Sequence, residues 1–375
     1  SARSGAAKGS RATRPCCWWT RRLAEPGDDW RRLALDPPRA WGSTPVSGAL
    51  RVEAADFRVD ENLGFRADGG EAHRLLLVEK SNANTLFVAR ALAARAGKPP
   101  SEVGFAGQKD RRAIARQWFS VPAGREVASF VGYAGEGFRV LEEHPHSRKL
   151  RRGALAGNRF RIRVRGLRGD AAAIDARIAH LVSAGVPNYF GPQRFGRDGA
   201  NIERIRRWLA SGRLPRGREQ RAFLLSAARS LAFNAVLGAR VAASSWNRLL
   251  PGEVVNLAGS ASVFAAEAPD EGLQRRLREG DVSPTGPLCG AGGLLPGGEA
   301  GRVEGEALEA VAPLPALLAV VGLRAERRAL ILRPANCRHA LSGDTLEIEF
   351  DLPRGSFATT VLRELLDARV PEAGD

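Results

Sequence analysis

Apolar and polar positions between residues 49 and 120 alternate in a way that predicts strands and helices in turn. The segment LRVEAADFRVDE, from Leu50, has the period of a strand, with an interruption at Ala54–Ala55. HRLLLVEKS, from His73, is apolar enough for a buried strand, and a shorter strand signal lies around Val103–Phe105. The segment predicts a sheet with helices between its strands.

The stretch NTLFVARALAARAG is the clearest helix of this region. Asn84 and Thr85 are residues that cap helices, apolar side chains then recur at spacings of three and four, and Gly97 follows the last turn. A second helix, DAAAIDARIAHLVSAG, runs from Asp170 to Gly185. Between the two, RFRIRVRGL from Arg159 alternates charged with apolar residues, which predicts a half-buried strand with arginines on its outer face.

After Gly185 the composition changes. An aromatic and glycine-rich loop, VPNYFGPQRFGRDGA, leads into a helix from about Asn201, and REQRAFLLSAARSLAFNAVLGARVAA predicts a long, largely buried helix. The stretch VSPTGPLCGAGGLLPGGEAG, from Val282, has no period and is expected to be a surface loop. The end of the chain, from Glu326, again resembles the first region: two strands, the second at LEIEFDL, and then a helix from about Ser356. A main domain interrupted by an insertion is expected.

Charge narrows the class of partner. The 375 residues carry a formal net charge of +16, mostly from arginine, which suits phosphate and stacked bases better than lysine. The usual polyanionic partners are nucleic acid and anionic membrane, and the balance favours nucleic acid. No run of some 18 consecutive apolar residues appears, which argues against a membrane-spanning helix. Hydrophobic residues make up 44% of the chain, enough for proper cores.

The cysteine and histidine positions do not indicate a structural metal site or a disulfide framework. Cys16, Cys17, Cys289 and Cys337 have no zinc-site spacing, no histidine completes a set, and a reducing cytoplasm is expected. Residues 1–27 are rich in arginine and small residues without a period. They are expected to be a disordered leader, with an RNA-binding arm as the alternative.

The stretch GFAGQKDRRAIARQWFSV raises the question of chemistry. Asp110 stands between Lys109 and the pair Arg111–Arg112, in a loop that follows a strand. It either neutralises a basic patch or acts as nucleophile or base on a polyanion that the patch holds. The chain has no GxSxG elbow, Walker loop, dinucleotide fingerprint or zinc deaminase signature. Phe57 and Phe357 lie in polar settings and suit base stacking, although core packing explains each as well.

Five motifs, collinear from about Asp28 to Asp367, resemble those of the TruD-type tRNA pseudouridine synthases. GFAGQKDRRAIARQWFSV is similar to the family's nucleophile motif, and EAADFRVDENLGFRADGG with the following strand and helix to its N-terminal region. KLRRGALAGNRFRIRVR resembles its central motif, VPNYFGPQRFGRDGANI the start of its insertion, and LPRGSFATTVLREL its C-terminal signature.

The resemblance implies a fold and a reaction. The fold is α+β: a pseudouridine-synthase catalytic domain with a mixed, largely antiparallel sheet, interrupted by an inserted α/β domain. The catalytic domain would comprise residues 28–184 and 331–375, and the inserted domain residues 185–330. The family isomerises uridine 13 in the D-arm of tRNA to pseudouridine without metal or cofactor. A monomeric cytoplasmic enzyme with tRNA as its partner, and no membrane, is expected.

The resemblance also implies site residues. The catalytic aspartate falls on Asp110, and the aromatic residue that stacks on the flipped base falls on Phe57 or Phe357; a sandwich of the base between the two is the hypothesis. A substrate-contacting asparagine falls on Asn158, with Phe160 beside it.

Two positions depart from the family's pattern. Arg51 stands where many members have a lysine that pairs with the catalytic aspartate, and Arg111–Arg112 replaces a basic residue followed by histidine. The leader has no recognised counterpart. A non-catalytic tRNA-binding protein on the same fold is the alternative, and a methyltransferase lacks its cofactor motif.

Overall fold

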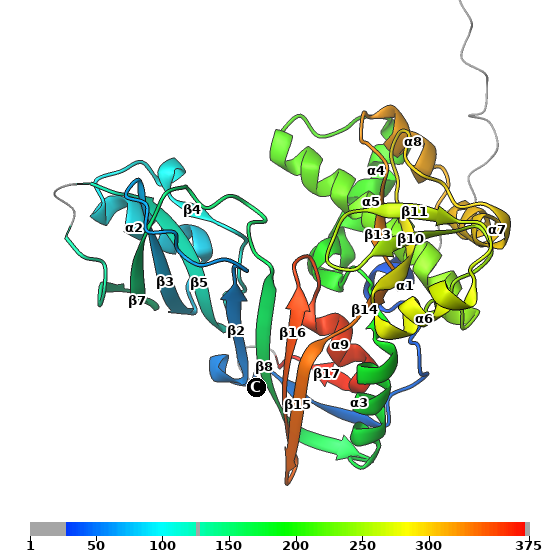
Figure 1. Cartoon of the computed structure of the whole chain (residues 1–375), viewed down its shortest axis with the longest axis horizontal. Coiled ribbons are helices and arrows are strands. Elements are labelled where there is room, and N and C mark those ends of the chain that lie inside the picture. Colours follow the sequence, from blue (N-terminus) through cyan, green and yellow to red (C-terminus); the bar gives the residue numbers. More distant parts are fainter. Residues whose placement is uncertain (1–27, 125–127, 372–375) are drawn as a thin grey trace, which may run out of the picture.

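The structure is a computed structural model that describes residues 28–124 and 128–371. The expected leader, residues 1–27 with Cys16 and Cys17, lies outside the described residues. Figure 1 shows one long sheet through the molecule, with β8 (Gly157–Gly169) between a part that carries α2 and a part that carries α3 and α9. A second group of helices and short strands lies above α9 in that view.

The large sheet is mixed and mostly antiparallel, which confirms the predicted fold class. In the described part of the chain it has 11 strands, and only the pairs β2–β5 and β1–β17 are parallel. Its main path runs in the order β15 (Ala335–Ser342), β16 (Thr345–Pro353), β8, β2 (Phe57–Asn62), β5 (Ile114–Pro122), β3 (His73–Ser81), β7 (Phe138–His146) and β6 (Ala134–Gly135). Beside this path lie β1 (Val46–Leu50), β17 (Asp367–Arg369) and β4 (Gly104–Phe105).

Helices cover one face of this sheet in two places. Val78, Phe119 and Val121 pack with residues of α2 (Thr85–Arg95). Phe160 and Phe350 belong to the core that also contains residues of α3 (Ala173–Ala184) and α9 (Ala358–Leu365). Strand alternation and register put all five side chains on the same face of the sheet. The helices therefore cover the two ends of this face, and its middle, between them, has no helix on it in the described part of the chain.

The opposite face of β8 carries a ladder of paired charges. Arg159 pairs with Asp351 at 2.8 Å, Arg161 with Glu349 at 3.1 Å, and Arg163 with Glu347. The predicted arginine-lined outer face is thus present, and its guanidiniums are neutralised by carboxylates of the adjacent strand.

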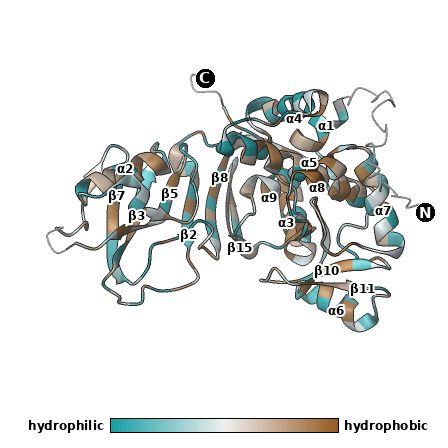
Figure 2. Cartoon of the chain, turned by 90° about the horizontal axis from the view of Figure 1, so that it is seen from above, coloured by the Kyte–Doolittle hydropathy of each residue, from teal (hydrophilic) through white to brown (hydrophobic). Residues whose placement is uncertain are grey.

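A second core is built mostly from residues between 185 and 330. Its long helix α5 packs against shorter helices and against a four-stranded antiparallel sheet of order β11-β10-β12-β13. Figure 2 shows hydrophobic residues gathered in α5 and α8. The helices of this core are α1 (Asp28–Leu35), α4 (Ala200–Ser211), α5 (Arg218–Ala242), α6 (Glu271–Glu279), α7 (Gly298–Glu309) and α8 (Leu314–Val320). The strands are β10 (Glu253–Leu257), β11 (Val263–Ala266), β12 (Val282–Leu288) and β13 (Glu326–Ala329).

Short elements complete the chain. A two-stranded pairing of β9 (Val186–Pro187) with β14 (Ile331–Leu332) connects the two ends of the predicted insertion. The remaining 3-10 turns are η1 (Ala54–Asp56), η2 (Pro100–Glu102), η3 (Pro192–Phe195) and η4 (Arg197–Gly199). The turn η1 accounts for the predicted interruption at Ala54–Ala55, because it separates β1 from β2.

The prediction of a surface loop from Val282 is wrong for the first third of that stretch. Residues 282–288 form β12, which is buried and lies between β10 and β13. A strand covered on both faces has no alternation to detect, and its two prolines and glycine resemble a loop. The prediction also missed α7, which begins at Gly298 within the same glycine-rich stretch.

The helix α5 is long and apolar enough to cross a membrane by length and composition, although polar residues interrupt it. Of its most apolar 18-residue window, 72% is buried inside the protein. Its apolar surface is therefore used by the second core.

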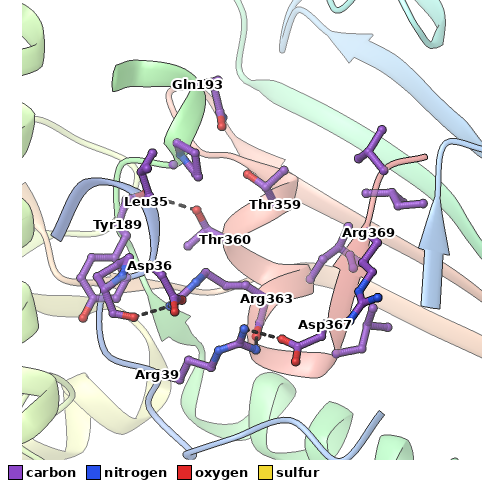
Figure 3. Close-up of a pocket in the computed structure, with 18 of the residues that line it drawn as sticks. Leu35, Asp36, Arg39, Tyr189, Gln193, Thr359, Thr360, Arg363, Asp367 and Arg369 are labelled. Atoms are coloured by element: carbon purple, nitrogen blue, oxygen red, sulfur yellow. Dashed lines mark hydrogen bonds and ion pairs between the residues drawn. The ribbon is translucent and has the colours of Figure 1, made fainter. Parts of the chain in front are cut away.

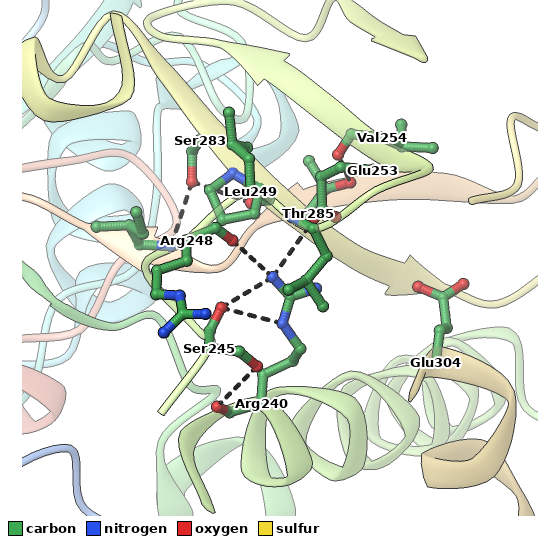
Figure 4. Close-up of polar contacts among 12 residues, drawn as sticks. Arg240, Ser245, Arg248, Leu249, Glu253, Val254, Ser283, Thr285 and Glu304 are labelled. Carbon is green, nitrogen blue, oxygen red and sulfur yellow. Dashed lines mark hydrogen bonds and ion pairs between the residues drawn. The ribbon is translucent and has the colours of Figure 1, made fainter. Parts of the chain in front are cut away.

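A buried ion pair fixes the end of α5 to this core (Figure 4). The Arg240 guanidinium donates to Glu253 Oε2 at 3.0 Å and to the carbonyls of Ser245 and Arg248 at 2.9 and 2.8 Å. The side chains of Arg240 and Glu253 are only 3% and 1% exposed. Burial raises the pKa of Glu253 against the attraction of Arg240. Neither charge can reach water, so the loss of either partner would leave an unpaired charge in the core and lower the stability of the fold.

Replacing Arg240 with Met is expected to lower the free energy of unfolding by about 3–5 kcal/mol, because Glu253 is left without its cation. The matched control is Arg302→Met, which breaks an exposed pair with Glu306 on α7 and is expected to cost about 0.5 kcal/mol or less. Urea unfolding of both variants measures the difference. Equal stability of the two variants would contradict the account.

Candidate active site

Asp110 lies in the loop between β4 and β5, which contacts the uncovered middle of the sheet face that α2, α3 and α9 cover at either side. Its side chain is 59% exposed, whereas Ala113 and Ala115, which follow it, are fully buried. The loop therefore leaves the sheet, presents one carboxylate, and returns to the core within a few residues. A reactive group on a loop held by a rigid sheet is a common arrangement for catalysis.

Arg51 holds the carboxylate from the junction between β1 and η1. Its guanidinium donates to Asp110 Oδ2 at 2.5 Å, and its side chain is 19% exposed. Its φ is +60°, in the left-handed region that non-glycine residues seldom adopt. The backbone is turned at this point, where the strand ends and the side chain reaches Asp110 across 59 residues of sequence. Arginine thus forms the ion pair that the resemblance implied for a lysine.

Lys80 holds the main chain of the same loop from below. It is the penultimate residue of β3, 1% exposed, and its ammonium donates to the carbonyls of Ala83 and Asp110, both at 2.9 Å, and Lys109 at 3.3 Å. Burial lowers its pKa from 10.5 to about 8, the Asp110 charge opposes this and the Lys109 charge adds to it. A buried ammonium bonded to three carbonyls fixes the loop from which the Asp110 side chain projects.

Lys109 points the other way, into the sheet. Its ammonium pairs with Glu61 Oε1 at 2.8 Å and donates to Asn158 Oδ1 at 2.5 Å. Glu61 and Asn158 are direct partners in the β2–β8 register, and Glu61 Oε2 accepts from the Trp118 amide at 2.9 Å. Asn158, predicted as a substrate contact, is thus joined to the Asp110 loop through Lys109.

A second support comes from α2. The Thr85 hydroxyl donates to Gln117 Oε1 at 3.0 Å and accepts from the Lys109 amide at 3.1 Å. Gln117 in turn donates to the Gly107 carbonyl at 2.6 Å. The first residue of α2 and a buried residue of β5 therefore also bind the loop, in addition to Lys80.

Phe57 and Phe160 form the apolar floor beside Arg51. The Arg51 guanidinium lies 4.1 Å from the Phe57 ring centroid, and Phe160 contacts that ring edge-on at 6.1 Å. Phe57 is 2% exposed, so neither of its ring faces is open in this structure. Stacking of a base on Phe57 requires Arg51 to move, and it stays a prediction.

Phe357 lies apart from this cluster, at the residue before α9. It is half-buried, and its ring is 6.5 Å from that of Phe190. Arg328 fixes the loop that precedes it by donating to the Gly355 carbonyl at 3.2 Å and to Asn188 Oδ1 at 2.6 Å. Burial lowers the pKa of Arg328 to about 10. The role of Phe357 as the second stacking ring likewise stays a prediction.

The structure thus brings together Asp110 with Arg51, Phe57 with Phe160, and Asn158 with the loop, while Phe357 approaches from another element. Sequence reasoning assigned no role to Lys80 or Glu61, and it placed Lys109 in a basic patch, whereas the structure pairs Lys109 with Glu61. Lys80 had a detectable signal, since it follows Leu76 and Val78 on the buried face of one strand, where a lysine needs partners.

The described residues contain no group of three or more His, Cys, Asp or Glu side chains that would hold a metal ion. The arrangement offers one exposed carboxylate with a cation on one oxygen and a fixed backbone. Such a group suits nucleophilic attack or proton removal at a carbon atom.

Known proteins are similar to this chain in sequence and in fold. The sequence model of the family "tRNA pseudouridine synthase D (TruD)" matches residues 38–216 and 210–365. A tRNA pseudouridine synthase D of Methylococcus capsulatus is 44% identical over 334 residues, which cover 88% of this chain and 94% of that protein. That of Nitrosococcus oceani is 43% identical over 333 residues, covering 87% and 93%.

A solved structure agrees in fold. The crystal structure of a putative tRNA pseudouridine synthase D from Methanosarcina mazei superimposes with a TM-score of 0.69. It is 21% identical and covers 90% of this chain and 97% of its own, so the likeness concerns the fold.

The Lys80 ammonium is expected to titrate with a pKa of about 8, well below that of an ordinary lysine, because it is buried. Replacing Asp110 with Asn removes the nearby negative charge and should lower the Lys80 pKa further. Replacing the exposed Asp344 with Asn, in the β15–β16 turn, should leave it unchanged. NMR titration of the lysine side chains measures all three proteins, and a Lys80 pKa near 10.5 would contradict the burial of its ammonium.

Proposed function

The chain belongs to the TruD family of tRNA pseudouridine synthases, and on that premise we propose that Asp110 performs its chemistry. The enzyme is an isomerase that converts uridine 13 of tRNA to pseudouridine. The observation that carries the proposal is the exposed Asp110 carboxylate. Arg51 pairs with one of its oxygens, and Lys80 donates to the main-chain carbonyl of Asp110.

The reaction needs one reactive carboxylate, and it needs no redox partner and no net water. The N1–C1′ glycosidic bond breaks, the uracil turns, and a C5–C1′ bond forms, after which C5 loses its hydrogen as a proton and N1 regains one. No electrons are exchanged with another molecule and no net water is consumed, so we propose that no cofactor or metal takes part.

Two roles for Asp110 fit this chemistry. Attack on C1′ gives a glycosyl ester that the rotated uracil displaces through C5. Removal of the 2′ proton instead gives a glycal, to which the uracil adds again. In both, Arg51 orients the carboxylate, and the fixed loop keeps the reacting oxygen in place.

The target base has to leave its stack to reach Asp110, which requires a place to hold it. We propose that Phe57 and Phe357 enclose the flipped uracil, with Arg51 moving off Phe57, and that Asn158 contacts its polar edge beside Phe160. The Lys109 bond to Asn158 supports this, because it fixes the amide in one orientation.

The tRNA partner is supported by charge. Beyond the net charge of +16, Arg194 and Arg328 lie about the Phe190 ring, at 5.5 and 4.3 Å from its centroid. Neither has a carboxylate within 4 Å among the residues that the structure describes, so both add positive charge that no acidic side chain neutralises. We further propose that the enzyme acts as a monomer in the cytoplasm, without a membrane. The catalytic domain is proposed to comprise residues 28–184 and 331–375, with the insertion at 185–330.

Replacing Asp110 with Asn is expected to lower the rate of isomerisation by at least about 10²-fold, because the amide neither attacks carbon nor accepts a proton. The assay is tritium release from tRNA labelled at uridine C5, since that hydrogen leaves only when C5 becomes the attachment point. Binding of tRNA by filter retention should stay within a few-fold of wild type.

Asp344→Asn, which removes the same charge from an exposed turn, is the control and should retain full activity. Tritium release by Asp110→Asn at the wild-type rate would remove Asp110 from the chemistry. Absence of release by wild-type protein at low salt would instead count against the isomerase itself.

A further inference from the structure

A cavity of about 470 Å³ lies beside the candidate active site, between α9, β17 and two loops (Figure 3). Its volume is in the range of small-molecule sites, roughly 300–1,000 Å³. Leu50 lines it, and the next residue, Arg51, pairs with Asp110. Phe190 lines it as well and contacts Phe357. The cavity therefore adjoins both the cation that holds Asp110 and the ring expected to stack on the target base.

Two polar atoms of the cavity wall are buried without a hydrogen bond. Tyr189 is 1% exposed, and its hydroxyl has no partner in the described part of the chain. The hydroxyl of Thr359, in the first turn of α9, is buried and unpartnered in the same sense. An unsatisfied buried hydroxyl destabilises a protein, so its retention at a cavity wall points to a partner that is supplied from outside.

The charges of the cavity are unequally engaged. Arg39 pairs with Asp367 of β17 at 2.5 Å, and Arg363 of α9 pairs with Asp36 at 3.1 Å, so these two pairs bind β17 and α9 to the loop after α1. The side chain of Arg369, by contrast, forms no ion pair or hydrogen bond with any described residue, while its backbone pairs with β1. In Figure 3, Tyr189 and Arg369 lie on opposite sides of the view with Thr359 between them.

These features match one nucleotide. The flat aromatic and aliphatic walls, Tyr189, Phe190, Pro192 and Leu362 among them, suit the faces of a base. The free hydroxyls suit polar groups on a base edge, and the guanidinium of Arg369 suits a phosphate. We propose that this cavity binds a second nucleotide of the tRNA, a neighbour of the target uridine, unstacked from the chain and held while the target lies at Asp110.

The inference rests on the proposed function, because it takes its ligand from the same tRNA. A neighbouring nucleotide in the cavity would keep the strand open and set the register of the target base. Free mononucleotides share this chemistry and are the other source that the experiment has to distinguish.

The first test fills the cavity. Ala368 lines it from β17 and is exposed, so Ala368→Trp adds a ring there without entering the core. The Kd for tRNA is expected to rise by about tenfold, the loss of one stacked base. Ala340→Trp, at an exposed position of β15 in the same sheet and outside the cavity, is the matched control and should leave the Kd unchanged.

The second test identifies the nucleotide. Transcripts carrying a single abasic site at each position near the target are bound by wild type and by Ala368→Trp. One position should weaken binding to wild type by about tenfold and have no effect in the variant, because the cavity is already filled. Penalties that multiply at every position would overturn the proposal.

The third test separates binding from folding. Tyr189→Phe removes the unpartnered hydroxyl and should leave the melting temperature unchanged or raise it, while tRNA binding weakens several-fold. Lowered stability with unchanged binding would mean that the hydroxyl serves the fold alone, and would overturn the proposal. These tests measure tRNA binding, whereas the isomerase assay measures tritium release. Failure of the nucleotide site therefore changes the binding results alone, and failure of the isomerase changes tritium release.

Equilibrium dialysis with AMP, GMP, CMP and UMP addresses the other source. The proposal expects weak binding that tRNA displaces. Binding of a mononucleotide that persists beside saturating tRNA, and that is lost in Ala368→Trp, would assign the cavity to free nucleotides and overturn its role in tRNA recognition.

Discussion

The arrangement depends on how one loop is held against the sheet. Lys80 is buried under that loop, and its ammonium has carbonyl oxygens as its partners, two of them from Lys109 and Asp110 themselves. Burying an ammonium is costly unless it is bonded, so the loop can hardly leave without exposing an unpaired charge in the core. Lys80 thus fixes the backbone of Asp110, and the ion pair with Arg51 restricts rotation of its side chain.

The rest of the protein supplies the surface around that carboxylate. The large sheet brings β2, β5 and β8 together, so Glu61, Gln117 and Asn158 form one polar layer in an otherwise apolar face. The second core contributes from the other side. Its Arg328 ties the loop before Phe357 to Asn188, and Phe190 lies between Phe357 and the cavity that we assign to a second nucleotide. The proposed catalytic residue and the proposed nucleotide cavity therefore lie on different elements, next to each other at Leu50 and Arg51.

Sequence patterns anticipated local structure well and long-range pairing poorly. The helix after Asn84 begins at Thr85 and ends before Gly97, as predicted, but Asn84 makes no capping bond and the Thr85 hydroxyl serves the Asp110 loop. The strand β12 was missed because burial on both faces removes its period. The Arg51–Asp110 pair, 59 residues apart, has no local signal at all and came only from the family resemblance. The burial of Phe57 under Arg51 depends on side-chain packing, which periodicity does not describe.

The most direct test of the role of Asp110 is a crystal structure of the enzyme with tRNA that carries 5-fluorouridine at the target. Fluorine cannot leave C5 as a proton does, so the last step is blocked and the rearranged nucleotide stays bound. The account predicts a carboxylate oxygen of Asp110 within about 3.5 Å of C1′ or C2′ of that nucleotide, with Arg51 still at the other oxygen. A target sugar held against a different carboxylate, with Asp110 facing solvent, would contradict it.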